Sequence, residues 1–176
     1  MSFRPVCDVW ILARPTTGFY GSFPKGFLHR ARALLGVSPT DAVLHVCGGM
    51  VRKYPYRGLG PNDKTLDLDP ACEPDFLQDA RDPLPLNAGE LWDAALIDRP
   101  YTEEDASHYA TGSIALPGLN DLLRRALGVV PVGHRVGALD CLWGHPGKMG
   151  KEVAVVAVGT GRNNRARWYC VYERIL

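Results

Sequence analysis

The sequence of 176 residues lacks most of the patterns that would place it in a class at once. It has no excess of charge: 20 basic side chains nearly balance 19 acidic ones, so the net charge of +1 does not indicate a nucleic-acid binder. No apolar run is long enough to span a bilayer, and residues 1–8 have no apolar core of a signal peptide. We therefore expect one cytoplasmic domain over residues 1–176 that does not enter a membrane, with residues 1–22 as an N-terminal extension.

Metal and disulfide patterns are also missing. The five cysteines are odd in number and include no C-x-x-C pair, and three of them lie in apolar runs. Reduced, mostly buried thiols are expected from this arrangement. The five histidines show no metal-ligand spacing with the cysteines, so we expect no metal site.

The glycine-rich phosphate motifs are the third absence. The sequence contains neither G-x-G-x-x-G nor G-x-x-x-x-G-K-[ST]. The residues after Gly48-Gly49, up to Lys64, include two prolines and two glycines and form a poor helix, so no helix N-terminus awaits a pyrophosphate. This disfavours NAD, FAD and ATP and suits a cofactor without phosphates.

What is present is a series of short apolar runs with helical segments between them. Helices are expected over residues 23–35 and 117–127, and residues 9–12 favour a short strand. Seven further strands are expected over residues 42–47, 65–68, 76–79, 92–98, 135–142, 152–158 and 167–174. Several runs are apolar on both faces, which is typical of a sheet covered by helices on both sides. The short link between the last two predicts an antiparallel hairpin, so the fold class is α/β, doubly wound and Rossmann-like.

Polar groups and glycines follow four of these strands in order. Gly48-Gly49 closes the first, Asp67 ends the second, Asp79 the third and Asp98 the fourth. In an open α/β sheet, ligands bind at the carboxyl ends of the strands, and an acid about 20 residues after the glycines is placed to accept ribose hydroxyls. The order and spacing predict a nucleoside-bearing cofactor.

These motifs resemble those of the class I S-adenosylmethionine-dependent methyltransferases. Residues 43–49 resemble the first motif, although the usual G-x-G loop reads Cys-Gly-Gly here, and residues 66–70, 78–85 and 92–101 resemble the second to fourth. The resemblance implies a seven-stranded sheet and S-adenosylmethionine as cofactor. The residues that it implies for cofactor binding are His45, Cys47, Gly48, Gly49, Asp67, Leu68, Asp79, Ala80 and Asp98.

Asp98-Arg99-Pro100-Tyr101 is similar to the D-P-P-Y signature of amino-methyltransferases that act on adenine N6 or cytosine N4 of DNA. The resemblance implies Asp98, Pro100 and Tyr101 as catalytic residues. Asp98 and the next carbonyl would accept the two N–H groups of the amine, while Tyr101 stacks on a flipped base. Arg99 replaces the first proline of the signature. Its carbonyl survives, and its charge could contact a phosphate or an acidic substrate.

Basic residues near these motifs suggest a polymer substrate. Arg52 and Lys53 lie among tyrosines directly after the glycine pair, which suits single-stranded or flipped nucleic acid, and equally a packed surface loop. Residues 162–167 carry three arginines that suit a solvated turn more than phosphate contact. Nucleic acid is the expected partner, with DNA favoured, for a monomer or homodimer. No target-recognition domain follows the last strand, so rim loops, a second subunit or a partner would supply specificity.

Two alternatives stay open at this stage. In the first, the chain methylates RNA, a protein or a small molecule, and Arg99 and the basic loop bind an anionic substrate. In the second, the chain binds the cofactor without catalysing a reaction.

Overall fold

The protein was analysed as a computed structural model that describes residues 4–56, 58–107, 116–160 and 165–176. The strands are β1 (Val6–Leu12), β2 (Val43–Val46), β3 (Lys64–Asp67), β4 (Phe76–Leu77), β5 (Ala94–Ile97), β6 (Arg135–Asp140), β7 (Gly150–Thr160) and β8 (Arg167–Arg174). The helices are α1 (Phe27–Leu35), α2 (Glu103–Ser107) and α3 (Leu119–Gly128), with short 3₁₀ turns η1 (Val51–Lys53), η2 (Pro70–Cys72) and η3 (Gly147–Met149).

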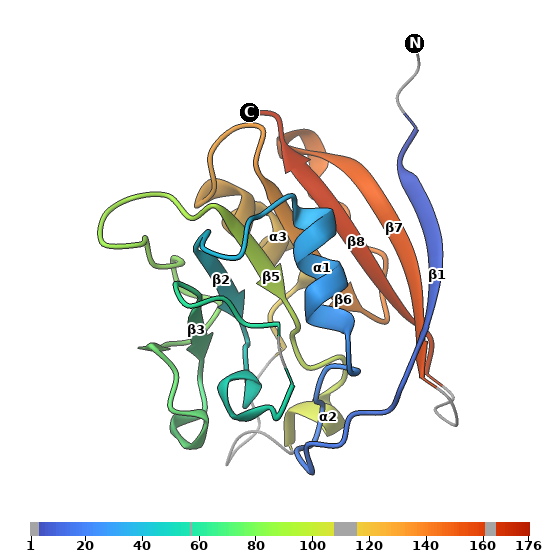
Figure 1. The fold of residues 1–176 in the computed structure, drawn as a ribbon. Coiled ribbons are helices and arrows are strands. Elements are labelled where there is room, and N and C mark those ends of the chain that lie inside the picture. Colours follow the sequence, from blue (N-terminus) through green and yellow to red (C-terminus); the bar gives the residue numbers. More distant parts are fainter. Residues whose placement is uncertain (1–3, 57, 108–115, 161–164) are drawn as a thin grey trace.

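All eight strands form one sheet in the order β1-β7-β8-β6-β5-β2-β3-β4 (Figure 1). Strands β2 to β6 pair in parallel, whereas β8 lies antiparallel between β6 and β7. The expected antiparallel C-terminal hairpin is therefore confirmed. Its connecting residues 161–164, which include Arg162 of the three expected arginines, lie outside the described part of the chain.

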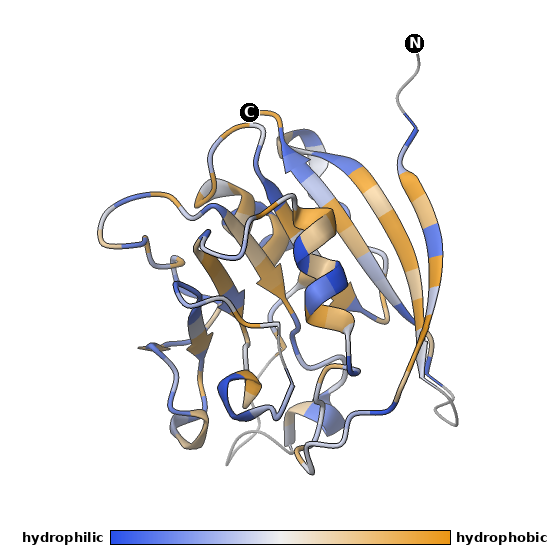
Figure 2. Ribbon diagram, viewed as in Figure 1, coloured by the Kyte–Doolittle hydropathy of each residue, from blue (hydrophilic) through white to orange (hydrophobic). Residues whose placement is uncertain are grey.

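Helices cover both faces of the sheet, as the two-sided apolar strands predict (Figures 1 and 2). In β5, Ala95 and Ile97 pack into the core that contains α3, while Ala94 and Leu96 pack into the core that contains α1. All four residues are buried because β5 is central and has a helix on each side. Burying each such side chain stabilises the fold by about 1–3 kcal/mol.

The sheet has one strand more than the expected seven. Strand β1 is longer than the segment predicted over residues 9–12 and pairs in parallel with β7 along seven residues. Its partner β7 has 11 residues and pairs with β8 along one edge. The backbone N–H and C=O groups on the opposite edge of β7 pair with β1. The N-terminal extension thus contributes an edge strand to the sheet.

Helix α1 begins four residues later than predicted. Gly26 adopts φ 86°, a left-handed conformation that cannot continue a right-handed helix, so Phe23 lies before the helix. The predicted end is confirmed: Gly36 is left-handed at φ 74° and its N–H bonds the carbonyl of Ala33.

Candidate functional site

A cavity of about 610 Å³ opens at the carboxyl ends of the central parallel strands. This volume lies within the range of small-molecule sites, and the position is the one where open α/β sheets bind ligands. Eight of the nine residues expected to bind the cofactor line it: Cys47, Gly48, Gly49, Asp67, Leu68, Asp79, Ala80 and Asp98. Arg99, Pro100 and Tyr101 also line it, so the four strand ends meet in one cavity.

The Cys-Gly-Gly loop forms the turn that follows β2. Cys47 stands where a G-x-G loop has its first glycine and adopts φ 57°, a left-handed conformation that costs a non-glycine residue free energy. Gly48 is packed tightly, since an added Cβ would lie 3.2 Å from Thr65 Cγ2. Gly49 is left-handed at φ 51°, with open space where a Cβ would stand. The loop keeps the backbone close to the sheet and leaves room for a ligand above it.

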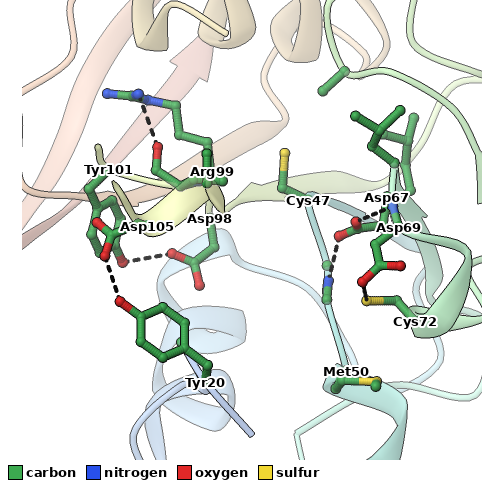
Figure 3. A pocket seen from close by; sticks show the side chains of 18 of the residues that line it. Tyr20, Cys47, Met50, Asp67, Asp69, Cys72, Asp98, Arg99, Tyr101 and Asp105 are labelled. Atoms are coloured by element: carbon green, nitrogen blue, oxygen red, sulfur yellow. Dashed lines mark hydrogen bonds between the residues drawn. The ribbon is translucent and has the colours of Figure 1, made fainter. Parts of the chain in front are cut away.

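Asp67 fastens this loop to the end of β3. One carboxylate oxygen accepts the N–H of Gly49 at 2.8 Å, and the other accepts the N–H of Asp69 at 3.0 Å (Figure 3). Burial raises the pKa of Asp67, while these backbone hydrogen bonds act in the opposite direction. Each carboxylate oxygen can accept a further hydrogen bond, so ribose hydroxyls can be bound without breaking either contact.

Asp79 is already engaged in the structure. Arg81 donates from Nε at 3.0 Å and Nη2 at 2.6 Å to its carboxylate, and the Arg81 N–H adds a bond at 2.8 Å. These hydrogen bonds hold the pKa of Asp79 below its usual value. An adenine amine at this carboxylate would have to displace the guanidinium, which is 45% exposed and so free to move. The adjacent Ala80 is buried.

Asp98 and Tyr101 form a hydrogen-bonded pair on the opposite side of the cavity from Asp67. The Tyr101 hydroxyl donates to Asp98 Oδ1 at 2.8 Å (Figure 3). Burial raises the pKa of Asp98 to about 7, although the hydrogen bond from Tyr101 lowers it in part. The pKa of Tyr101 lies well above its ordinary value, chiefly because of burial. Asp98 can therefore gain or lose a proton near neutral pH.

Arg99 is not the free charge at the cavity mouth that the sequence suggested. Its side chain is 5% exposed, and its Nε lies 2.8 Å from Asp140 Oδ2 at the end of β6. Neither of these two atoms has a hydrogen-bond partner among the described residues, but Arg99 Nη2 donates to the other carboxylate oxygen, Asp140 Oδ1, at 3.4 Å. Arg99 Nη1 also donates to the Pro100 carbonyl at 3.2 Å. A buried guanidinium needs such a counter-charge, so Arg99 fixes the turn after β5 rather than reaching a phosphate.

His45 is the expected cofactor residue that does not line the cavity. It is buried, with Nε2 3.0 Å from Asp63 Oδ2. Asp63 also accepts Arg32 Nη1 at 2.7–2.8 Å and the N–H groups of Val43 and Gly60. Side chains alternate along a strand, and His45 points away from the cavity into this network. It ties β2 to α1 and to the loop before β3.

Arg52 and Lys53 also lie outside the cavity lining. Arg52 forms an ion pair with Asp75, and Lys53 Nζ lies 2.9 Å from Glu73 Oε1. The sequence places these acids about 20 residues later, so their proximity arises only when β3 and β4 bring η1 and η2 together. The structure favours the packed surface loop over the phosphate-binding loop.

Three further segments, which the sequence did not assign to the site, also contribute side chains to the cavity. Tyr20 of the N-terminal segment, Asp105 of α2 and Arg165 before β8 all line the cavity. Tyr20 donates to Asp105 Oδ1 at 2.7 Å (Figure 3). Arg165 Nη1 lies 2.8 Å from Asp105 Oδ2. Burial would raise the pKa of Asp105, but these bonds and one from Thr102 outweigh it, so the pKa is lowered. Thr102 also accepts the Asp105 N–H at 3.1 Å, which caps the start of α2.

The described residues contain no group of three or more His, Cys, Asp or Glu side chains that could hold a metal ion. Among the same residues, no helix has both the length and the apolar character that crossing a membrane requires. The five cysteines are free.

Neither the protein-family models nor the curated proteins contain a match to this sequence. Solved structures, however, share its fold. TrmN from Thermus thermophilus has a TM-score of 0.64 at 21% identity, over 90% of this chain and 51% of TrmN. This protein therefore shares the fold of TrmN. The N-methyltransferase NodS from Bradyrhizobium japonicum WM9 has a TM-score of 0.59 at 11% identity, over 85% of this chain and 95% of NodS. The rRNA methyltransferase aviRa from Streptomyces viridochromogenes has a TM-score of 0.54 at 14% identity, over 89% of this chain and 88% of aviRa.

This chain covers 51% of TrmN and thus spans about half its length. All three structures have the Rossmann-like architecture expected from the strand pattern. At identities of 11–21%, they show the fold.

Proposed function

We propose that this protein is an S-adenosylmethionine-dependent methyltransferase that acts on an exocyclic amine of a nucleobase. The observation that carries the proposal is the placement of Asp98 and Asp67 on two sides of one cavity, with Cys47 between them (Figure 3). One acid has the position expected for a cofactor ribose, and the other has the position expected for the methyl acceptor.

The cavity fits S-adenosylmethionine in chemistry as well as in size. It offers a glycine loop without a following α-helix, because only the 3₁₀ turn η1 comes after Gly49. Such a loop suits a nucleoside without phosphates, since no long helix dipole faces the ligand. Asp67 retains acceptor capacity for ribose hydroxyls, and Leu68 offers an apolar wall. NodS has also been solved with S-adenosyl-L-homocysteine, with a TM-score of 0.54 to this chain.

The chemistry of Asp98 supports an amine as the acceptor. The lone pair of an exocyclic amine is delocalised into its ring, so the nitrogen attacks a methyl group poorly. A carboxylate that accepts an amine N–H favours the pyramidal nitrogen and orients it towards the methyl group. When bound, S-adenosylmethionine supplies that methyl group. With its pKa near 7, Asp98 can also hold the proton that the nitrogen loses.

The proposal includes a nucleic acid, DNA or RNA, as the polymer that carries the methylated base. The similarity of residues 98–101 to D-P-P-Y favours DNA, whereas the likeness to an rRNA methyltransferase favours RNA. Both substrates present the same amines, so the chemistry of the site serves either. Nucleic acid of either kind remains the proposed partner of a chain that acts as a monomer or homodimer.

Methyl transfer from tritiated S-adenosylmethionine to DNA, RNA and protein, assayed in parallel, tests the proposal. We expect label in nucleic acid, on adenine or cytosine after hydrolysis to nucleosides. Label only in protein or small molecules would overturn the nucleobase assignment. Tight S-adenosylhomocysteine binding without transfer to any acceptor would identify a cofactor-binding module instead.

A further inference from the structure

Arg167 stands beside the Asp98–Tyr101 pair at the base of the cavity. It is the first residue of β8, and β8 runs antiparallel to its neighbours. The start of an antiparallel strand lies where the parallel strands end, so Arg167 reaches the ligand-binding edge of the sheet. The sequence groups it with a solvated turn, because the side chains that surround residue 167 come together only in the folded sheet.

The guanidinium of Arg167 is buried but not fully satisfied. The residue is only 8% exposed, and its Nε has no hydrogen-bond partner among the described residues. It interacts with the Tyr101 hydroxyl and lowers the pKa of Asp98 by charge, and no ion pair with a carboxylate is found for it in the part of the chain that the structure describes. The other buried arginine of the site, Arg99, is matched to Asp140. A buried N–H group without an acceptor costs about 1–3 kcal/mol. Because Arg167 also lines the ligand cavity, its guanidinium is suited to an acceptor on the ligand.

We propose that Arg167 is a specificity-determining residue that donates a hydrogen bond to an acceptor atom of the substrate next to the amine held by Asp98. The inference rests on the proposed amine-methyltransferase function. Asp98 accepts from the amine while Arg167 donates to the neighbouring ring nitrogen, which is N1 or N7 in adenine and N3 in cytosine. Thymine and uracil lack the amine, and simple alkylamines lack the acceptor. The pair therefore selects an amino group beside a ring nitrogen.

Binding of single-stranded oligothymidylates with one central target base tests this inference, with the protein saturated with S-adenosylhomocysteine. The target bases are adenine, 1-deazaadenine, 7-deazaadenine, cytosine and 3-deazacytosine, and the all-thymine strand is the background. For the wild-type protein we expect loss of one ring nitrogen to weaken binding about tenfold or more. In Arg167→Met, which keeps the side-chain length, parent and deaza strands should bind within about twofold of each other.

Arg124→Met is the matched control, because Arg124 is exposed on α3 and pairs with Asp121 outside the cavity. It should keep the wild-type discrimination. S-adenosylhomocysteine affinity and thermal unfolding report whether Arg167→Met is folded, and Arg167→Gln provides a second variant with a polar side chain.

Three outcomes would overturn the inference. Wild-type binding that ignores the deaza changes, or discrimination that persists in the folded Arg167 variants, removes Arg167 from substrate recognition and leaves the proposed function intact. Equal binding of all strands, the all-thymine strand included, by cofactor-loaded wild-type protein overturns the nucleobase substrate as well.

Discussion

The Tyr101 hydroxyl donates a hydrogen bond to Asp98 at 2.8 Å, so these two residues of the turn after β5 are coupled. The D-P-P-Y resemblance alone assigns Tyr101 only a stacking ring. The structure adds a role for its hydroxyl, because the hydrogen bond holds down the pKa of an otherwise buried carboxyl.

Tyr101→Phe should therefore change the pH dependence of methyl transfer. Loss of the donor raises the pKa of Asp98 further, so the rate at pH 7 should fall about threefold to tenfold and recover at higher pH. Initial rates between pH 6 and 9 for the variant and wild type measure this. Superimposable profiles would show that the ring alone matters.

Asp98 should set the lower limb of the pH–rate profile. With its pKa at about 7, it is protonated at lower pH and then accepts an amine N–H more weakly, so activity should rise through neutrality. Asp98→Ala, which removes the acceptor, should abolish transfer while S-adenosylhomocysteine affinity stays within about twofold, because the loss occurs in the transition state. Full activity in this variant would remove Asp98 from the chemistry.

The same residue predicts a stability effect of defined sign. The folded pKa lies above the unfolded value of about 4, so the folded state holds a proton that the unfolded state has lost. The free energy of unfolding attributable to Asp98 should thus fall as pH rises from about 4 to 7. Thermal unfolding should show that the stability of Asp98→Asn relative to the wild type increases between pH 5 and pH 8. A constant difference would contradict the raised pKa.

Asp67→Ala should weaken S-adenosylhomocysteine binding by about 1–3 kcal/mol, through loss of ribose contacts and of the clamp on Gly49. Calorimetry measures the effect, and Asp82→Ala, an exposed acid outside the cavity lining, is the control. Equal affinities for the two variants would exclude Asp67 from the cofactor site.

Asp63 should contribute to the stability of the fold and not to cofactor binding. Asp63→Ala leaves Arg32 and His45 without their buried partner and should cost about 3–5 kcal/mol of unfolding free energy. His45→Ala should bind S-adenosylhomocysteine as the wild type does wherever it is folded, since His45 does not line the cavity. Loss of affinity in folded His45→Ala would restore its expected cofactor role.

The sequence determined the α/β class, the succession of strands along the chain, the C-terminal hairpin and the four strand ends that meet at the cavity. These features depend on local patterns: apolar runs, glycine at turns, and acids placed where strands end. Asp67 and Asp98 were found in this way, because position at a strand end is itself readable from the sequence.

Only the tertiary structure decided which polar groups are free to act. His45, Arg52, Lys53 and Arg99 each have an acidic partner 18 to 41 residues away, and the chain must fold before those charges meet. The place of β8 between β6 and β7 likewise brings Arg167 to the cavity. Short-range patterns encode where a strand ends, but charge pairing and the order of strands across the sheet are long-range properties that packing of the whole sheet sets.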